Sequence, residues 1–491
     1  MRKILVIILL AIIILSVSCR KTRDFSNDSS LNIELSSDTI TFDTVFTCIG
    51  SSTRILMVYN NTDENLKINS VRLEQGSESP YSVNVDGIAG TDFSNVEIYA
   101  HDSLYVFVKV TIDPTDENNP FFVEDRLIFN TNGNEKVAHL TAYGQNAHYI
   151  IGNIGIFPDE QGHYTNYYYP VTDSVNTDVH WTAEKPYVIY NVALIDSDGT
   201  LTIEPGTHVY FHGGAGLWAW SEGQLIVNGT AENPVVFQGD RLESYYQDQP
   251  GQWDRIWLME AREGHGHSIN HAIIRNGFIG LQIQRMLKDN YAATYITNTI
   301  IENHTGMGVY ANCYSIGMSN LVVNNCGNYC IALTGGGEYV INHGTIANYW
   351  TSSTRKAEAL FFNNLYQNPT DGITYAIPFN CEINNSIIYG NQENEFGSGF
   401  HEGTDTLYTF RNSLIRTQRP HGNTSLYESC VFNKSPKFKN TEKFDFHIND
   451  KSAAIGIGNP VYSTGELQYD LDGVDRGTSP DAGAYQYVIP E

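Results

Sequence analysis

Ile273-Ile274-Arg275-Asn276 begins a pattern that returns as Ile300-Ile301-Glu302-Asn303 and Val322-Val323-Asn324-Asn325: an apolar pair, a polar residue and an asparagine. Looser copies follow at Thr345-Ile346-Ala347-Asn348, Leu365-Tyr366-Gln367-Asn368, Ile387-Ile388-Tyr389-Gly390, Leu414-Ile415-Arg416-Thr417 and Cys430-Val431-Phe432-Asn433. The steps between their final positions are 27, 22, 23, 20, 22, 27 and 16 residues. Self-similarity at such a period indicates a solenoid.

A second recurring position within this repeat lies five residues before each final residue. It is asparagine in five copies, at Asn298, Asn320, Asn363, Asn385 and Asn412, and histidine in two, at His271 and His343. Asparagine tolerates the left-handed backbone conformation, and its amide can hydrogen-bond to a neighbouring coil. We therefore predict a structural ladder at the corners of the coils.

The type of solenoid follows from the residues between the corners. Leucine-rich repeats share the period but need several spaced leucines in each copy. Here the repeated units are short β-branched runs divided by Gly and Asn, without helical periodicity. A parallel β-helix fits this pattern, with inward apolar residues stacked along its axis.

Earlier segments carry a resemblance to a known family. They are Pro186–Ile189, Leu201–Thr207, Val209–Phe211, Gly223–Thr230, Pro234–Phe237 and Gly251–Ile256. These segments resemble the first coils of bacterial right-handed parallel β-helix proteins. Asp472–Arg476 and Pro480–Tyr485 resemble the closing motif of such exported proteins. The resemblance implies a right-handed single-stranded parallel β-helix, and the family includes polysaccharide lyases and glycoside hydrolases.

The first part of the chain predicts a β-sandwich. Eight strand-like segments, separated by turn clusters, are Thr39–Phe46, Arg54–Asn60, Lys67–Glu74, Tyr81–Val85, Asn95–Tyr99, Ser103–Ile112, Arg126–Asn130 and Val137–Tyr143. Seven or eight strands over this length suit an Ig-like sandwich. Some of the segments resemble the hydin-like Ig domains of bacterial envelope proteins. The predicted fold class is therefore all-β, with an Ig-like sandwich followed by the β-helix.

The N-terminus predicts an exported, anchored protein. Arg2 and Lys3 precede the apolar run Ile4–Leu15, which is too short to span a bilayer but suits a signal peptide. The residues before Cys19 resemble a bacterial lipobox, which implies lipidation of Cys19; an ordinary signal peptide is the alternative. The predicted divisions are a signal peptide at 1–18, a tether at 19–30, a sandwich at 31–147, a linker and N-terminal cap at 148–185, a β-helix at 186–460 and a C-terminal cap at 461–491.

Composition excludes several classes of function. The chain has 491 residues, with 55 acidic and 29 basic side chains and a formal charge of −26. This excess repels phosphate backbones and argues against a nucleic-acid partner. The charged fraction of 17% and the hydrophobic fraction of 41% exclude a mostly disordered chain. By resemblance, we expect an outer-membrane lipoprotein of the Bacteroidetes type, facing the periplasm or the cell surface.

Candidate ligand-binding residues cluster before the first repeat copy. Tyr245, Tyr246, Trp253 and Trp257 lie close in sequence to several carboxylates, a combination that suits sugar binding. Trp253 also belongs to the family's structural pattern, so packing under a loop is the alternative.

Catalytic residues are not recognisable. Gly264-His265-Gly266 resembles a polygalacturonase motif, but the Asp-Asp pair that accompanies it there is missing from this sequence. We interpret Gly264–His267 as a loop. Asp470, Asp472 and Asp475 could bind Ca²⁺, but they lack EF-hand spacing, and a structural role is favoured.

The remaining cysteines have no compact disulfide spacing, so buried free thiols are expected. They are Cys48, Cys313, Cys326, Cys330, Cys381 and Cys430.

We expect no cofactor and no metal. The predicted function is non-catalytic binding of a glycan or a surface protein by a membrane-anchored β-helix. One alternative is a carbohydrate-active enzyme, a polysaccharide lyase or a glycoside hydrolase. A third interpretation is a structural or adhesive spacer without a specific ligand.

Overall fold

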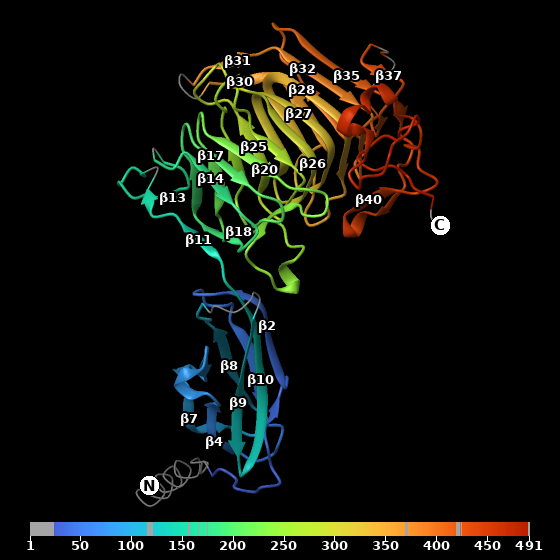
Figure 1. Ribbon diagram of the computed structural model, residues 1–491. Helices are drawn as coiled ribbons and strands as arrows, with labels where there is room; N and C mark the ends of the chain where they lie inside the picture. The colour runs from blue at the N-terminus through green and yellow to red at the C-terminus, as the bar shows by residue number, and fades with distance from the viewer. Residues whose placement is uncertain are drawn as a thin grey trace, which may run out of the picture. The chain divides into compact units, whose positions relative to one another are not determined.

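The computed structural model describes residues 24–114, 121–155, 158–164, 166–173, 175–368, 372–418, 423 and 425–489. The chain is 52% strand and 4% helical, which confirms the predicted all-β class. It divides into two compact units, Met1–Asn146 and Ala147–Glu491 (Figure 1). Cys19 and the signal peptide predicted before it lie outside the described residues.

Helical structure in the described residues is limited to short 3-10 turns: η1 (Gly76–Glu78), η2 (Ser244–Tyr246), η3 (Thr441–Lys443), η4 (Pro460–Tyr462) and η5 (Gly465–Gln468). The described residues contain no helix with the length and apolar character needed to cross a membrane.

The first unit contains two five-stranded sheets. One sheet is formed, in order, by β1 (Glu34–Leu35), β3 (Arg54–Tyr59), β8 (Ser103–Val110), β5 (Tyr81–Val85) and β6 (Ile88–Gly90). The other is formed by β2 (Thr39–Phe46), β10 (Asn134–Gln145), β9 (Phe121–Thr131), β4 (Leu66–Leu73) and β7 (Asp92–Ile98). Alternate residues of each strand point inward, and both sheets contribute to one apolar core.

All eight strands expected in this unit from the sequence are confirmed, as β2, β3, β4, β5, β7, β8, β9 and β10. β1 and β6 were missed because they are only two and three residues long and carry no alternating apolar pattern.

The second unit is built on one sheet of 26 strands among the described residues. Its first strands are β11 (His148–Ile151), β12 (Ile154–Gly155), β13 (Tyr167–Pro170), β14 (Asp178–Trp181), β15 (Tyr187–Tyr190), β16 (Val192–Ile195), β17 (Thr200–Ile203), β18 (His208–Phe211), β19 (Gly216–Ala219), β20 (Gln224–Asn228), β21 (Val235–Gly239), β22 (Ile256–Leu258), β23 (Ser268–Asn270), β24 (Ala272–Arg275) and β25 (Ile279–Gln284). From β13 to β20 a strand pairs in parallel with the strand three places later, so three short strands complete one coil.

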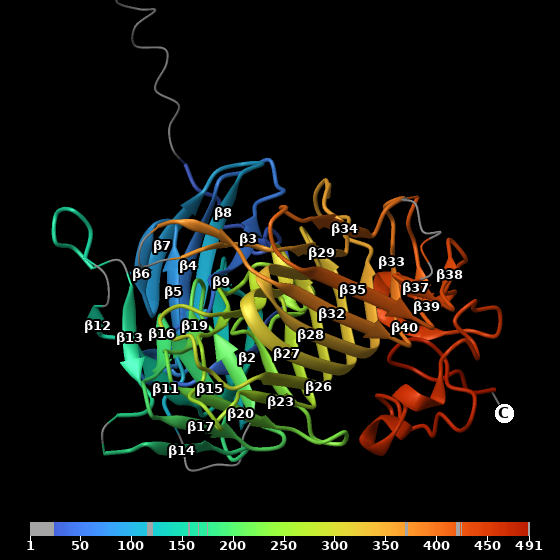
Figure 2. The ribbon, with the colours of Figure 1, turned by 90° about the horizontal axis from the view of Figure 1, so that it is seen from above.

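Longer strands continue the same sheet (Figure 2). They are β26 (Thr294–His304), β27 (Met307–Cys326) and β28 (Ile331–Asn348), followed by β29 (Leu360–Asn363), β32 (Phe379–Asn384), β33 (Ile387–Gly390), β34 (Phe396–Gly399), β35 (Thr406–Arg411), β36 (Leu414–Ile415), β37 (Tyr427–Glu428) and β38 (Val431–Phe432). The predicted parallel-strand solenoid is confirmed in this form.

The sequence repeat sets the register of the stack. The second apolar residue of each pair aligns with its counterpart in the next coil. These aligned residues are fully buried: Ile274, Ile301, Val323, Ile346, Ile388 and Ile415. Full burial of one such side chain stabilises the fold by about 1.5–3 kcal/mol, so every coil in this row contributes to the stability of the stack.

The predicted asparagine ladder is present at the corners. The Nδ2 group of Asn320 donates to Oδ1 of Asn298 at 3.0 Å. In a second ladder, Nδ2 of Asn325 donates to Oδ1 of Asn303, and Nδ2 of Asn303 donates to Oδ1 of Asn276, both at 2.8 Å. All five have a positive φ between 46° and 66°. The same left-handed conformation is found at His271, His343, Asn385 and Asn412.

One predicted repeat copy is wrong. Leu365–Gln367 forms β30, which pairs antiparallel with β31 (Thr374–Ala376) in a separate hairpin. The coil containing Thr345–Asn348 pairs directly with Ile387–Gly390, a step of 42 residues. The residue types of Leu365–Asn368 match the repeat. However, Tyr366, at the position predicted to point into the core, is buried against Arg285 at the side of the stack.

The segment 148–185, predicted as a linker and N-terminal cap, already belongs to the parallel sheet. Its strands β11, β13 and β14 pair in parallel with β15, β16 and β17. These strands are short and partly exposed, because an end coil has a neighbour on one side only. They therefore lack the apolar pattern that marks the later coils.

The C-terminal segment covers an outer face of the later coils. It includes β39 (Phe438–Asn440) and β40 (Asp445–Ile448). Ala484 donates its backbone N–H to Oγ1 of Thr345 at 2.9 Å, and Nη2 of Arg476 donates to Oδ1 of Asn320 at 2.9 Å. Apolar residues of this segment bury the outward members of the repeat pairs, including Val322 and Ile387.

Candidate functional site

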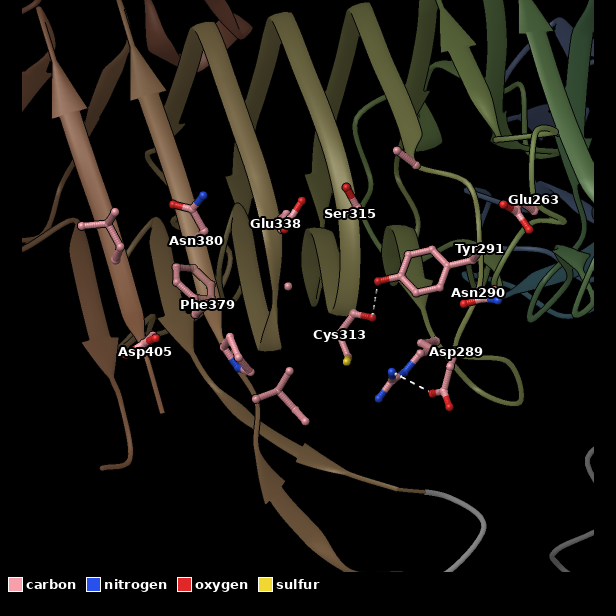
Figure 3. Close-up of a pocket in the computed structure, with 16 residues that line it drawn as sticks. Glu263, Asp289, Asn290, Tyr291, Cys313, Ser315, Glu338, Phe379, Asn380 and Asp405 are labelled. Atoms are coloured by element: carbon pink, nitrogen blue, oxygen red, sulfur yellow. Dashed lines mark hydrogen bonds and ion pairs between the residues drawn. The ribbon is translucent and has the colours of Figure 1, made fainter. Parts of the chain in front are cut away.

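A hollow of about 760 Å³ lies on the outer face of the second unit, over β27, β28, β32 and β35 (Figure 3). It is lined by Glu263, Arg285, Asp289, Asn290, Tyr291, Ala293, Cys313, Ser315, Gly337, Glu338, Ile377, Pro378, Phe379, Asn380, Asp405 and Leu407. A second hollow of about 380 Å³ shares Ala293, Ser315 and Glu338 with the first. The two hollows adjoin at these residues and are together called here the outer groove.

The parallel register arranges the floor of the outer groove in rows. One row runs through Ser315, Glu338, Asn380 and Leu407 in successive coils. Residues two positions apart on a strand face the same side, so neighbouring rows share this face.

In the next row, an aromatic residue is paired with a glycine of the neighbouring coil. Tyr295 is followed across the coils by Gly317, Val340 and Glu382. The Tyr295 side chain is 58% exposed, and a Cβ atom at Gly317 would lie 2.9 Å from its Cδ1 atom. The glycine therefore leaves room for the ring to lie over the neighbouring coil.

Amides and hydroxyls form a third row, through Thr297, Ser319, Asn342 and Asn384. Nδ2 of Asn384 donates to Oδ1 of Asn342 at 3.0 Å. Ser319 and Asn342 line the second hollow together with Tyr295. The outer groove thus combines an exposed aromatic face with uncharged donors and acceptors.

Charges gather at one end of the outer groove. Nη1 of Arg285 lies 3.0 Å from Oδ1 of Asp289, and the guanidinium lies 4.7 Å from the centre of the Tyr366 ring. The carboxylates of Glu263, Glu338 and Asp405 line the same hollow. Tyr366 belongs to the β30–β31 hairpin, so this hairpin holds Arg285 in place.

Tyr291 and Cys313 lie together near the charged end (Figure 3). The Tyr291 hydroxyl donates to the carbonyl oxygen of Cys313 at 3.3 Å, and its ring packs 4.5 Å from that of Tyr314. Burial raises the pKa of the Tyr291 phenol and the pKa of the Cys313 thiol. Both groups are therefore neutral near pH 7, and Tyr291 is a hydrogen-bond donor rather than a base.

The residues proposed from the sequence do not line the outer groove. Tyr245 and Tyr246 are in contact, with ring centres 5.1 Å apart. Tyr246 lines a separate hollow of about 270 Å³, where the Arg241 guanidinium lies 3.9 Å from its ring centre. Tyr245, next to it, is 71% exposed.

Both tryptophans have packing roles. Trp253 is 1% exposed, stacks on Phe211 at 4.4 Å and donates its Nε1–H to the carbonyl oxygen of Arg275. It is not available to a ligand, because its indole fills the core beneath the loop. Trp257 packs edge-on against Trp218 at 4.9 Å, on an outer patch distinct from the outer groove.

Sequence reasoning missed Tyr295, Tyr291 and Glu338. A signal for Tyr295 was present, because it stands three residues before the corner Asn298, and Gly317 stands three before Asn320. Aligning that outward position across the repeat would have paired the two residues. Tyr291 and Asp405 lie in loops outside the repeat and left no comparable signal.

Other sequence candidates have structural surroundings. His267, in the segment read as a loop, is buried, accepts from the Leu225 N–H and donates to the Met259 carbonyl. Asp470 is buried and accepts backbone N–H groups of Asp472, Val474 and Gln486. Among the described residues, no group of three or more His, Cys, Asp or Glu is arranged to hold a metal ion.

The six cysteines in the described ranges are unpaired. Cys313, Cys326, Cys330 and Cys381 are buried and Cys430 is partly buried. Cys48 is exposed, contrary to expectation, because it lies in a turn with a left-handed backbone rather than on an inward strand position.

No known family model matches the chain, and no curated protein matches it in sequence. Among solved structures, it is similar to the catalytic domain of a GH87 alpha-1,3-glucanase, with 12% identity over 73% of this chain and 82% of that one and a TM-score of 0.18. A family 123 glycoside hydrolase from Clostridium perfringens has 7% identity over 24% of this chain, with a TM-score of 0.17.

A protein of unknown function from Porphyromonas gingivalis W83 has 11% identity over 30% of this chain, with a TM-score of 0.17. The present chain spans 27% of the Clostridium enzyme and 58% of the Porphyromonas protein. TM-scores at this level carry no argument about function.

Proposed function

We propose that this chain is an exported lipoprotein that binds a glycan, without catalysis, along the outer groove of a right-handed parallel β-helix. The β-helix assignment is supported by coils of three parallel strands and by the stacked row of buried aliphatic residues. The Ig-like assignment of the first unit is supported by its two five-stranded sheets around one core.

The observation that carries the glycan proposal is the aromatic platform in the outer groove. The Tyr295 ring is 58% exposed although it lies over a neighbouring coil at Gly317. An aromatic face offers a large contact area at a small cost in conformational entropy. Ser319 and Asn342 flank it with uncharged polar groups that can hydrogen-bond to sugar hydroxyls.

A glycan-binding assay with Tyr295→Ala tests this proposal. The full chain, solubilised with its anchor in detergent, is titrated with a panel of neutral and acidic polysaccharides and host glycans. We expect saturable binding without product, and Tyr295→Ala is expected to weaken it about tenfold, which corresponds to about 1.4 kcal/mol. Because Tyr245 is 71% exposed and lies outside the outer groove, Tyr245→Ala is the matched control. Binding to no glycan, or equal losses in both variants, would refute the proposal.

A surface protein as the partner is the alternative within the same class. It would use the same outer groove, and the same Tyr295→Ala variant would then lose protein binding while all glycans fail to bind.

A carbohydrate-active enzyme is the second candidate function. The observation that favours it is the set of carboxylates, Glu263, Asp289, Glu338 and Asp405, in one hollow. Glycoside hydrolysis needs two carboxyl groups about 5–10 Å apart. New reducing ends or unsaturated products during the binding assay, abolished by Glu338→Gln, would establish this function and exclude the non-catalytic one.

A further inference from the structure

The charge of the outer groove restricts the class of glycan that it can hold. Its larger hollow is lined by four carboxylates and, among the described residues, by a single guanidinium, that of Arg285. Glu338 lies where the two hollows meet, so a ligand that follows the groove must pass it. The formal charge of the chain, −26, has the same sign.

The positive charge of Arg285 is already paired with a carboxylate. Its Nη1 atom lies 3.0 Å from Asp289, and its guanidinium lies against the Tyr366 ring. The side chain is only 20% exposed. An anionic sugar would compete with Asp289 for Arg285 and would face the carboxylates of Glu338 and Asp405.

Apart from Glu338, the polar residues that line the hollow around Tyr295 carry no charge. Ser315, Ser319, Asn342 and Asn380 supply hydroxyl and amide groups along the rows of the floor. These groups donate and accept hydrogen bonds equally well, which matches the hydroxyls of an unmodified pyranose.

We propose that the outer groove takes a glycan that carries no carboxylate, sulfate or phosphate groups. This proposal rests on glycan binding as the function of the same groove. The Tyr295 ring supports one sugar face, the serine and asparagine rows bind its hydroxyls, and Glu338 and Asp405 exclude polyanions.

The experiment compares two classes of polymer on the full-length protein. Laminarin, dextran and mannan are the neutral probes; polygalacturonate, alginate and heparin are the acidic ones. At low ionic strength, at least one neutral polymer is expected to bind at least about tenfold more tightly than any acidic one. Raising the salt from about 0.01 M to about 0.5 M is expected to leave neutral binding unchanged and to strengthen acidic binding, because salt screens the repulsion.

A charge variant locates the effect in the outer groove. Glu338→Gln keeps the shape of the side chain and removes one negative charge. It is expected to raise the affinity for acidic polymers, relative to that for neutral ones, about threefold or more at low salt. Glu160→Gln is the matched control, because Glu160 is exposed and lines neither hollow.

The outcomes separate this inference from the function on which it rests. Acidic polymers that bind more tightly than every neutral one, in a manner lost in Tyr295→Ala, would overturn the charge inference and leave glycan binding in place. Equal effects of Glu338→Gln and Glu160→Gln would also overturn it. Binding of neither class would remove the glycan proposal itself.

Discussion

At the scale of single residues, neighbouring coils decide what each side chain does. Tyr295 and Trp253 are both aromatic residues on parallel coils, yet one is 58% exposed and the other 1%. Gly317 leaves space for the Tyr295 ring on the outside, whereas Phe211 stacks on the Trp253 ring in the core. The sequence near Trp253 suggested a binding site, but the exposed platform lies about two repeats further on.

Two fully buried histidines give the fold a pH dependence. His304 accepts the Gly277 N–H at Nδ1 and donates from Nε2 to the Ile274 carbonyl. His267 is bound in the same way by Leu225 and Met259. Burial lowers the pKa of each to about 4. The bond accepted at Nδ1 needs a neutral ring, so protonation opposes folding.

We predict that these histidines destabilise the fold as the pH falls from about 6.5 towards 4, because the unfolded chain binds protons there and the native chain does not. Each contributes about 3 kcal/mol to the loss at pH 4. Urea unfolding between pH 4 and 7 measures it. His304→Gln, which is polar but does not titrate, is expected to reduce the slope; an unchanged slope in a variant that is folded at pH 7 would contradict the assignment.

At the scale of elements, the long strands β26, β27 and β28 each cover two faces of a coil. They can do so because left-handed residues such as Asn298, Asn320 and His343 bend them without ending the pairing. The insertion between β29 and β32 forms the β30–β31 hairpin, which holds Arg285 beside the outer groove. The corners were predictable from the asparagine spacing, whereas the hairpin resembled one more repeat copy.

A buried ion pair joins two loops of the stack. The side chains of Arg355 and Glu395 are 1% and 0% exposed, and Nη2 of Arg355 lies 2.7 Å from Oε1 of Glu395. Arg355 also donates to the Asn348 and Ala357 carbonyls, and Glu395 accepts the Ala359 N–H. The pair therefore connects the segment before β29 to the segment before β34.

Removing one partner leaves a buried charge without compensation. Arg355→Met is expected to lower the free energy of unfolding by about 3–5 kcal/mol, and Arg355→Met with Glu395→Leu by less. Denaturant unfolding of both variants measures this difference. A loss below about 1 kcal/mol in the single variant, as for an exposed ion pair, would show that the pair does not hold these loops.

At the scale of the whole molecule, the C-terminal segment covers one face of the later coils and leaves the outer groove exposed. Apolar residues such as Phe446 and Tyr485 bury Val322 and Ala347 on the covered face. The rows through Tyr295 and Glu338 remain open. The last segment was predicted to be a C-terminal cap, and its contacts run along several coils.

Anchoring through Cys19 is the prediction at this scale. Lipidation adds about 0.8 kcal/mol of membrane affinity for each buried CH₂ group, so several acyl chains on one cysteine bind firmly. Cys19→Ala is expected to move the protein from the membrane to the soluble fraction after cell lysis. Cys48→Ala is the control, since Cys48 is exposed and unpaired but lies outside the lipobox. Equal membrane association of both variants would exclude the anchor.

The sequence by itself determined the all-β class, the eight main strands of the first unit and the register of most of the later coils. It could do so because stacked coils contact only their nearest neighbours. Residues one repeat apart in the sequence, such as Ile301 and Val323, are therefore neighbours in adjacent coils. Only the tertiary structure shows which side chains line the outer groove. Tyr295 and Glu338 lie in one groove, while Tyr246, Trp253 and Trp257 are separated. Exposure and cavities depend on loops, inserted hairpins and the C-terminal cover, which carry no repeat and whose contacts are distant in sequence.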